Sequence, residues 1–222
     1  MLFVIDFDGT LTLQDSVDAL LERFAEPEWR VVEQAWLDGE ITAVECMRRQ
    51  IRMVRADHMK LEAFFRGIPL DPGFLSFWQH VRRFAEVAIV SDGLDHGVEL
   101  AMRNGALPRL PVFANRLRFV PDGLDISFPH LHPACAGGNG VCKCEVSRRL
   151  AAGSGGPIVL VGDGKSDHCL AGNADEVFAK GKLARHCARA GIAFQPFESF
   201  ADVLARVRSW DPHPLAKEVR SA

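Results

Sequence analysis

The 222-residue sequence has no long apolar run, no surplus of basic residues and no secretory leader pattern. A membrane-spanning helix needs roughly 18 or more consecutive apolar residues, and no stretch here approaches that length. The formal net charge of −3 leaves no basic excess to neutralise a nucleic-acid backbone. The opening MLFVI is too short for a signal peptide and lacks its basic flank. We therefore expect a cytoplasmic protein that binds neither membranes nor nucleic acids.

The sequence also lacks a disulfide framework, because six cysteines in a chain of this length are few. It contains no C-x-x-C pair, which is the ligand spacing typical of zinc sites. Several metal-ligand types nevertheless fall within HLHPACAGGNGVCKC, residues 130–144. They are His130, His132, Cys135, Cys142 and Cys144. Three interpretations stay open for this segment: a glycine-rich loop of reduced thiols, a structural metal site and a redox-sensitive thiol pair.

A composition of 48% hydrophobic and 25% charged residues is typical of a globular protein and excludes a disordered or fibrous chain. Four continuous apolar runs end in acids or turn-forming residues, as strands of a parallel sheet covered on both faces do. These runs span residues 2–6, 86–93, 157–164 and 176–181. Amphipathic segments lie between them at 74–86, 96–107 and 143–153. The alternation predicts an α/β fold with three α/β/α layers and a mostly parallel sheet.

Two segments interrupt this alternation. Residues 15–70 are helical almost throughout and directly follow the first strand, so they are expected to form an inserted α-helical cap that returns at IPLDPGF. Residues 112–129 carry two roughly alternating runs around Pro-Asp-Gly, which predicts a β-hairpin. We expect a core of residues 1–13 and 71–222 and a cap of residues 14–70. The tail after Trp210 is expected to be a surface segment.

Polar residues gather where three predicted strands end, and ligands of parallel sheets bind beyond these ends. They are Asp6 and Asp8, Ser91 and Asp92, and Asp163 with Asp167. Carboxylates and a backbone carbonyl, without His or Cys at these ends, favour Mg²⁺, which bridges to a substrate phosphate. Because so many acids would by themselves repel a phosphate, we expect a basic side chain to lie close to them. Lys143 is the first candidate for this role and Lys165 the second.

Four motifs, in this order, resemble those of the haloacid dehalogenase superfamily. DFDGT resembles its first motif, D-x-D-G-[TS], and IVSDG resembles its second, a strand that ends in Ser or Thr. Lys143 fits the third motif, and VGDGKSD resembles the fourth, G-D-x-x-x-D. The resemblance covers residues 3–167. It implies a Rossmann-like catalytic core with a helical cap inserted after the first motif, and hydrolysis of a small phosphorylated metabolite.

The resemblance also implies catalytic and metal-binding roles for the matched acids. Asp6 would be the nucleophile that forms an aspartyl-phosphate, and Asp8 would protonate the leaving alcohol and then activate water. Mg²⁺ would be held by Asp6, the backbone carbonyl of Asp8 and Asp163. Asp167 would lie in the outer shell or orient Lys143.

The phosphate-binding residues implied by the same motifs are Thr10, Ser91, Asp92, Gly93 and Lys143. Ser91 and the backbone N–H groups that follow it would hold phosphate oxygens, while Lys143 balances their charge. Thr10 would bond back to the aspartate loop and keep its shape.

Within the superfamily the chain resembles helical-cap phosphatases of small molecules, and most of all those that act on a methylthio-ketopentenyl phosphate. VSDGLD…LPVFANRLRF and GNGVCKC carry that likeness. Phosphoserine phosphatases are the alternative, but they usually have Ser-Gly-Gly where Ser91 is followed by Asp92, and Asn where Ser166 stands. A phosphomutase would share the motifs, whereas a non-catalytic phosphate-binding protein would keep the pocket but lack a catalytic group. Monomer and homodimer are both open.

The cap is expected to select the non-phosphate end of the substrate. Gln14 and Asp15 lie at its entry, close in sequence to the nucleophile. Further candidates are Glu40, Arg48 and Arg52, although exposed helix faces explain most charged residues of this kind. The aromatic residues expected in the cap's own core are Phe24, Trp29 and Trp36.

Overall fold

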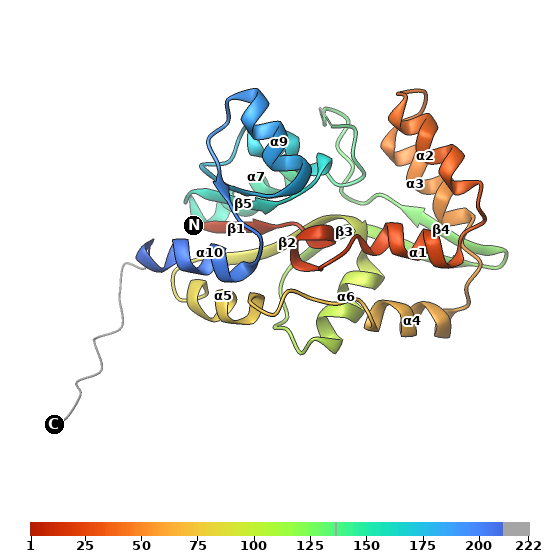
Figure 1. The fold of residues 1–222 in the computed structure, drawn as a ribbon, viewed down its shortest axis with the longest axis horizontal. Coiled ribbons are helices and arrows are strands. Elements are labelled where there is room, and N and C mark those ends of the chain that lie inside the picture. Colours follow the sequence, from red (N-terminus) through yellow and green to blue (C-terminus); the bar gives the residue numbers. More distant parts are fainter. Residues whose placement is uncertain (136, 211–222) are drawn as a thin grey trace.

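The computed structural model of the protein describes residues 1–135 and 137–210, in which seven strands form one sheet of order β4-β3-β2-β1-β5-β6-β7 (Figure 1). All neighbouring strands are parallel except β3 and β4. The tail after Trp210 lies outside the described residues. The strands are β1 (Leu2–Ile5), β2 (Glu86–Leu94), β3 (Val112–Val120), β4 (Gly123–Ser127), β5 (Ile158–Gly162), β6 (Glu176–Ala179) and β7 (Gln195–Pro196).

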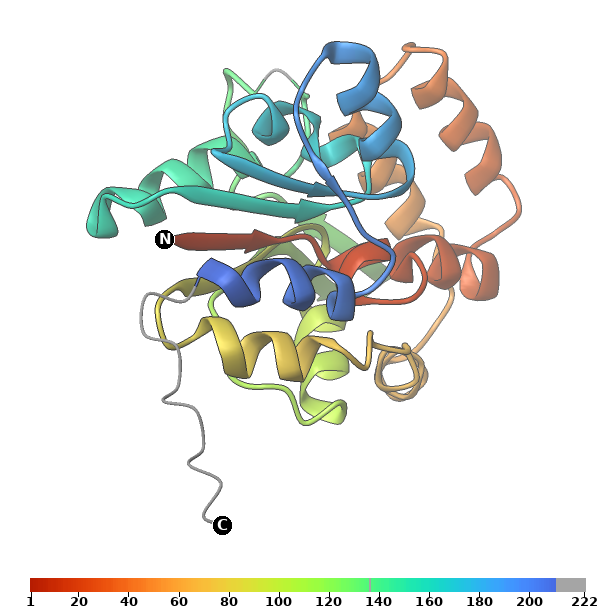
Figure 2. The same ribbon diagram turned by 60° about the vertical axis from the view of Figure 1, so that its left-hand side comes forward.

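Helices cover both faces of the sheet (Figures 1 and 2). One face carries α5 (Phe74–Val81), α6 (Asp95–Asn104) and α10 (Phe200–Val207), and the other carries α7 (Lys143–Ser154), α8 (His168–Ala171) and α9 (Gly181–Ala190). Successive residues of β1 point to opposite faces, as the period of a strand requires. Phe3 and Ile5 join the core beneath the first set of helices, and Leu2 and Val4 join the core beneath the second. The three-layer fold with a mostly parallel sheet is confirmed.

The local predictions hold with small differences at the ends of elements. The predicted hairpin is present, since β3 and β4 pair antiparallel from Val120 opposite Gly123 outward. The helix predicted over 74–86 ends at Val81, because the chain must turn there to enter β2. The amides of Phe84 and Ala85 both donate to the carbonyl of Val81 in that turn.

Four helices fill the segment between β1 and α5: α1 (Ser16–Phe24), α2 (Trp29–Leu37), α3 (Ala43–Arg52) and α4 (His58–Arg66). The chain leaves and re-enters the core at adjacent points, because Leu13 N–H donates to Pro69 O at 3.0 Å and Asp71 N–H to Leu11 O at 2.8 Å. Helices α2 and α3 form a hairpin that stands beyond the carboxyl ends of the strands, whereas α4 packs against α6 (Figure 1). The division into a core and a cap of residues 14–70 stays a prediction.

The remaining short elements are single turns: the π-helical turn η1 (Phe7–Leu11) and the 3₁₀ turns η2 (Lys165–Asp167) and η3 (Arg208–Trp210). Two of them follow directly on strand ends. Turn η1 follows β1 and turn η2 follows β5, so both lie at the carboxyl edge of the sheet.

Candidate active site

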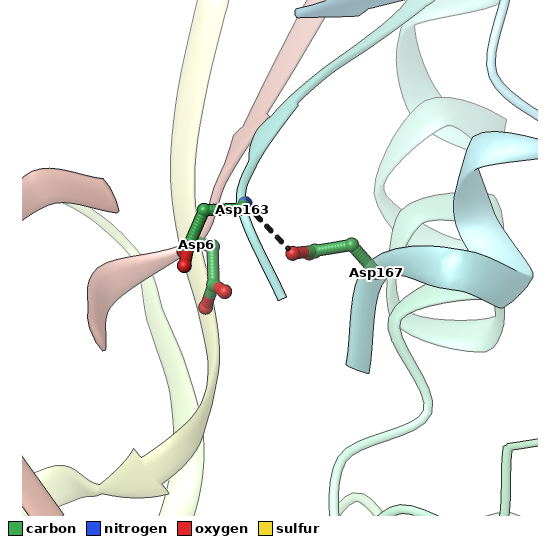
Figure 3. A group of neighbouring side chains, drawn as sticks. All are labelled: Asp6, Asp163 and Asp167. Carbon is green, nitrogen blue, oxygen red and sulfur yellow. Dashed lines mark hydrogen bonds between the residues drawn. The ribbon is translucent and has the colours of Figure 1, made fainter. Parts of the chain in front are cut away.

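Acids from two neighbouring strands meet at the carboxyl edge of the sheet (Figure 3). Asp6 follows β1, Asp163 follows β5, and Asp167 closes the turn η2. Carboxylate oxygens of the three residues all lie within 4.8 Å of one another. Within residues 1–135 and 137–210 this is the one group of three or more Asp, Glu, His or Cys side chains close enough to share a metal ion.

Lys143, the first residue of α7, is the cation among these acids. Its Nζ lies 2.8 Å from Asp6 Oδ1 and 2.6 Å from Asp167 Oδ1, and its side chain is completely buried. Burial acts to lower the pKa of Lys143, but the charges of Asp167 and Asp6 outweigh it and hold the pKa above its usual value. Lys165, the second candidate, lies instead over the ring of Trp36, with Nζ 4.6 Å from the ring centroid.

Asp167 is fully buried and uses both carboxylate oxygens within the protein. Oδ1 accepts from Lys143, and Oδ2 accepts from the amides of Asp163 at 3.2 Å and Gly164 at 3.0 Å; the first of these amide bonds is drawn in Figure 3. A carboxylate engaged at both oxygens has little left to offer a metal ion. Of the two roles implied for Asp167, the geometry favours orienting Lys143.

Asp6 and Asp163 retain oxygens that could hold a cation. Asp6 Oδ1 contacts Lys143, and Asp163 Oδ1 accepts from the Thr10 hydroxyl at 2.7 Å. No described residue donates a hydrogen bond to Oδ2 of either acid. Burial raises the pKa of both carboxyls, and the charge of Asp167 raises each further. Because Lys143 alone cannot balance this many acids, the oxygen set fits a hard divalent cation such as Mg²⁺.

Two threonines and a glycine shape the turn η1. Thr12 Oγ1 accepts from the Gly9 amide at 3.0 Å, and the Thr12 amide donates to Phe7 O at 3.0 Å. The hydroxyl that braces the loop is therefore that of Thr12 instead of the predicted Thr10, which is turned onto Asp163. Gly9 has φ +70°, and a Cβ there would lie 2.6 Å from Asp163 Oδ2, so a side chain is excluded on two grounds.

Asp8 faces α1 and β2 across the same turn. Its Oδ1 accepts from the amide of Ser16 at 2.8 Å and from the Ser16 hydroxyl, and its Oδ2 lies 3.5 Å from Ser91 Oγ. Burial raises the pKa of Asp8 to about 7, and the charge of Asp15 adds to the effect. A Cβ at Gly93 would lie 2.2 Å from Asp8 Oδ2, so this close approach requires glycine. A carboxyl that is half protonated near neutral pH suits a general acid and base.

The raised pKa of Asp8 leads us to expect that the metal-free protein loses stability as the pH rises toward and through 7. The folded protein keeps a proton on Asp8 up to about pH 7, whereas the unfolded chain releases it near pH 3.8. The contribution of Asp8 to the free energy of unfolding is therefore complete below pH 3.8 and declines above it. The difference between the folded and unfolded pKa values of Asp8 corresponds to up to about 4 kcal/mol of stability. In Asp8→Asn this part of the loss of stability with rising pH should be absent. Urea unfolding in EDTA at pH 5 and pH 8 measures it. Equal declines in both proteins would contradict the assignment to Asp8.

The end of β2 supplies the remaining predicted residues. Ser91 is fully buried, and its Oγ accepts from the Gly93 amide at 2.9 Å. The carboxylate of Asp92 accepts from the Val141 amide at 2.8 Å and from Asn115 Nδ2 at 3.1 Å. The side chain of Asp92 therefore ties β2 to β3 and to the loop before α7. The predicted contact of phosphate with the backbone N–H of Asp92 stays a prediction.

A cavity of about 470 Å³ opens in front of these acids. Its floor includes Asp6, Asp8, Ser91 and Asp163, while Lys143, Asp167 and Thr10 lie buried behind it. Residues of α1, α2 and α3 form the cap wall, and residues of η2 and α9 face them. Those of the cap wall include Asp15, Asp18, Glu33, Trp36, Cys46, Met47 and Gln50. Those of the facing wall include Lys165, Lys182 and Arg185, while Phe128 and Asn139 line the cavity from the segment between β4 and α7.

Only one of the five predicted cap residues lines this cavity, namely Asp15. Arg48 lies over the ring of Phe128, with Cζ 5.1 Å from the centroid, and Arg52 Nε bonds Asp125 Oδ1 at 3.1 Å. Gln14 and Glu40 lie elsewhere on the surface.

Trp36 was predicted to lie in the core of the cap, but its position in the structure is different. Trp29 is buried and Phe24 packs against the core, as expected. Trp36 lies two turns beyond Trp29 on α2 and is half-buried, and its ring lines the cavity beneath Lys165.

Residues 130–144 include the loop that leads to Lys143 at the start of α7. The Cys142 amide donates to His130 O at 3.0 Å, and Cys144 Sγ lies 2.6 Å from Cys169 Sγ. All six cysteines are free thiols. In the described part of the chain, the histidines and cysteines of this loop form no group of three near enough to share an ion.

Comparison with known proteins identifies the class of enzyme. Residues 3–172 match the family of haloacid dehalogenase-like hydrolases, and the chain therefore belongs to that family. A 2-hydroxy-3-keto-5-methylthiopentenyl-1-phosphate phosphatase from Exiguobacterium sibiricum is 30% identical over 209 residues, which cover 92% of this chain and 94% of that protein. A protein of the same name from Bacillus cereus (strain G9842) is 31% identical over 202 residues, with coverage of 89% and 91%. The resemblance seen in the four motifs is confirmed.

Solved structures agree on the fold. A haloacid dehalogenase family hydrolase from Salmonella enterica serovar Typhi has a TM-score of 0.73 at 21% identity and covers 91% of this chain and 69% of its own. A phosphoserine phosphatase carrying an analogue of the phospho-aspartyl intermediate has a TM-score of 0.68 at 22% identity, with coverage of 94% and 97%. Among the described residues, no helix combines the length and apolar character that crossing a bilayer requires.

Proposed function

We propose that the protein is a magnesium-dependent phosphomonoesterase that hydrolyses a small phosphorylated metabolite through an aspartyl-phosphate on Asp6. The observation that carries the proposal is the pairing of Asp6 and Asp8 on the floor of one cavity, with Lys143 buried between Asp6 and Asp167. The names of the curated relatives support the same reaction class. The proposal includes the predicted cytoplasmic location and a cap of residues 14–70 that closes over the substrate.

In the first step Asp6 attacks phosphorus, and an Asp6–phosphorus bond forms as the bond to the leaving alcohol breaks. Lys143 lowers the pKa of Asp6 against the raising effect of burial, and it holds the carboxylate in place through the contact at Oδ1. Asp8, whose pKa of about 7 leaves it largely protonated just below neutral pH, donates its proton to the leaving oxygen. In the second step Asp8 takes a proton from water, which attacks phosphorus and releases Asp6.

Charge at the phosphate is balanced from several directions. Ser91 and the amides of Asp92 and Gly93 bind phosphate oxygens, as the second motif implies. Mg²⁺, when bound by Asp6, the Asp8 carbonyl and Asp163, offsets the repulsion between the carboxylates and the phosphate.

The proposed substrate is a methylthio-ketopentenyl phosphate, the compound in the names of the curated relatives. The cavity supports this choice with apolar surface from Trp36, Met47 and Phe128. The basic residues that line it in the described chain come from η2 and α9, while the cap wall carries acids. A cap wall of this sign disfavours a substrate whose carboxylate faces the cap.

A phosphate-release assay tests the proposed substrate. With Mg²⁺ present, we expect kcat/KM for the methylthio-ketopentenyl phosphate to exceed that for phosphoserine by roughly tenfold or more, the discrimination that one well-placed contact supplies. A hexose monophosphate completes the panel, since a phosphomutase would convert it without net release of phosphate. A selective hit on phosphoserine would overturn the substrate assignment.

Removal of the metal should abolish turnover and lower stability. Because Mg²⁺ binds the folded protein alone, saturation at 100 times its dissociation constant should add about 2.7 kcal/mol to the free energy of unfolding. Asp163→Asn should lose most of this gain, while Asp175→Asn, at the surface end of β6, should keep it. Thermal melting with EDTA and with increasing Mg²⁺ measures both. Full activity in EDTA would contradict the metal requirement.

A further inference from the structure

Glu33 is one of the acids on the cap wall of the cavity. It belongs to α2, is half-buried and lines the cavity. In the described part of the chain it forms no ion pair with any lysine or arginine. Its charge instead adds to that of Asp15 near Asp18, whose pKa rises to about 6 through burial first and these two acids second. A negative side chain is thus kept on the cavity wall without an ion pair to any described lysine or arginine.

Gln50 holds one oxygen of Glu33 in place. Gln50 is 5% exposed, and its Nε2 donates to Glu33 Oε2 at 2.8 Å across the α2–α3 hairpin. The Cys46 thiol lies 3.7 Å from the same oxygen. No described residue donates a hydrogen bond to Glu33 Oε1. The carboxylate is therefore oriented by neutral donors and keeps one oxygen for an incoming group.

The chemistry of this arrangement selects a hydrogen-bond donor. A carboxylate partly removed from water binds a hydroxyl or enol strongly and repels a second anion. Trp36 lies one helical turn from Glu33 on α2, and Met47 lies one turn from Gln50 on α3; both also line the cavity. These soft, apolar side chains suit a thioether-bearing carbon chain beside the donor.

We infer that Glu33 is the specificity-determining residue of the cap: it accepts a hydrogen bond from a hydroxyl on the carbon chain of the substrate, and Gln50 is its positioning residue. The inference rests on the proposed function and adds to it a residue of the cap that contacts the substrate beyond its phosphate group. The simpler alternative is that the Glu33–Gln50 bond only joins α2 to α3. That alternative affects stability but not the preference for a hydroxylated ligand.

Competition against hydrolysis of an aryl phosphate measures this preference, because a ligand competes whether or not it is turned over. The two ligands are the 2-hydroxy-3-keto methylthio phosphate and its analogue without the hydroxyl. The readout is the ratio of their inhibition constants. In the wild-type protein the hydroxylated ligand should bind more tightly. Glu33→Gln should reduce the ratio about tenfold, because a charged acceptor makes the stronger hydrogen bond.

Two further variants sharpen the test. Gln50→Met keeps the length of the side chain but removes the amide donor, and should reduce the ratio about threefold because Glu33 keeps its charge but loses its support. Glu28→Gln, an exposed change at the start of the same helix, should leave the ratio unchanged. Melting temperatures of all three variants report whether the cap stays folded.

The outcomes separate this inference from the proposed function. If the hydroxylated ligand competes but is not hydrolysed, the proposed substrate is wrong, and the ratio still decides the role of Glu33. A ratio that Glu33→Gln leaves at the wild-type value, or a wild-type protein with no preference for the hydroxylated ligand, overturns the inference. If Glu33→Gln and Gln50→Met changed the melting temperature but not the ratio of inhibition constants, the Glu33–Gln50 bond would serve only to join α2 to α3.

Discussion

Asp6→Asn is expected to reduce magnesium-dependent hydrolysis of an aryl phosphate by roughly 10⁴-fold or more, the scale on which loss of a nucleophile acts. The amide cannot form an acyl-phosphate bond and carries no charge for the metal ion. The fold should survive, because Asp6 is buried with a raised pKa and its ionisation opposes folding at neutral pH. Lys143 also keeps its second partner, Asp167, at 2.6 Å.

The matched control is Asp122→Asn, an exposed change in the hairpin turn between β3 and β4. It should retain wild-type activity. The melting temperature of Asp6→Asn at pH 8 should equal or exceed that of the wild-type protein. Turnover near the wild-type rate in Asp6→Asn would exclude Asp6 as the nucleophile.

Lys143→Met is expected to destabilise the protein by about 3–5 kcal/mol, because it removes the cation from a buried ion-pair network. Asp6 and Asp167 would remain in the interior without their shared ammonium, and the nearby Asp163 would add to their repulsion. The same change should eliminate activity, since the ammonium that lowers the pKa of Asp6 and orients its carboxylate would be lost. Urea unfolding at neutral pH, with and without Mg²⁺, measures the loss.

A second variant separates lost charge balance from lost packing. Adding Asp167→Asn to Lys143→Met removes one of the stranded acids and should recover part of the stability but none of the activity. Lys165→Met is the control, because its ammonium is exposed over Trp36 and such contacts contribute about 0.5–1 kcal/mol. If Lys143→Met proved no more destabilising than Lys165→Met, the buried network would not carry the stability assigned to it.

Much of the fold and floor of the site could be predicted because both follow from short-range patterns. Continuous apolar runs marked the strands of a parallel sheet, and a parallel sheet brings its carboxyl ends to one edge. Asp6 and Asp163 follow such strands, and Ser91 lies near the end of β2, so their convergence is a consequence of topology. The prediction that Lys143 contacts these acids depended on the motif resemblance. Residue 143 begins a helix, and no local sequence pattern specifies where that helix packs.

The cap wall could not be predicted in the same way. Glu33 and Gln50 lie 17 residues apart on two amphipathic helices, and each reads in sequence as an ordinary polar position. Their contact depends on how α2 packs against α3, which is decided by tertiary packing and not by periodicity. Asn115 carried a weak signal, since an amide inside the apolar strand β3 needs partners, but the partner Asp92 could be identified only from the sheet.

Trapping the phosphoryl group on the enzyme tests the central proposal most directly. In Asp8→Asn an aryl phosphate can still react with Asp6, because its leaving group needs no proton, whereas the second step lacks its base. Mass spectrometry of the acid-quenched, digested variant should find one phosphoryl group on the peptide that contains residue 6. A phosphoryl group on another residue, or phosphate released with that peptide never modified, would contradict the aspartyl-phosphate mechanism.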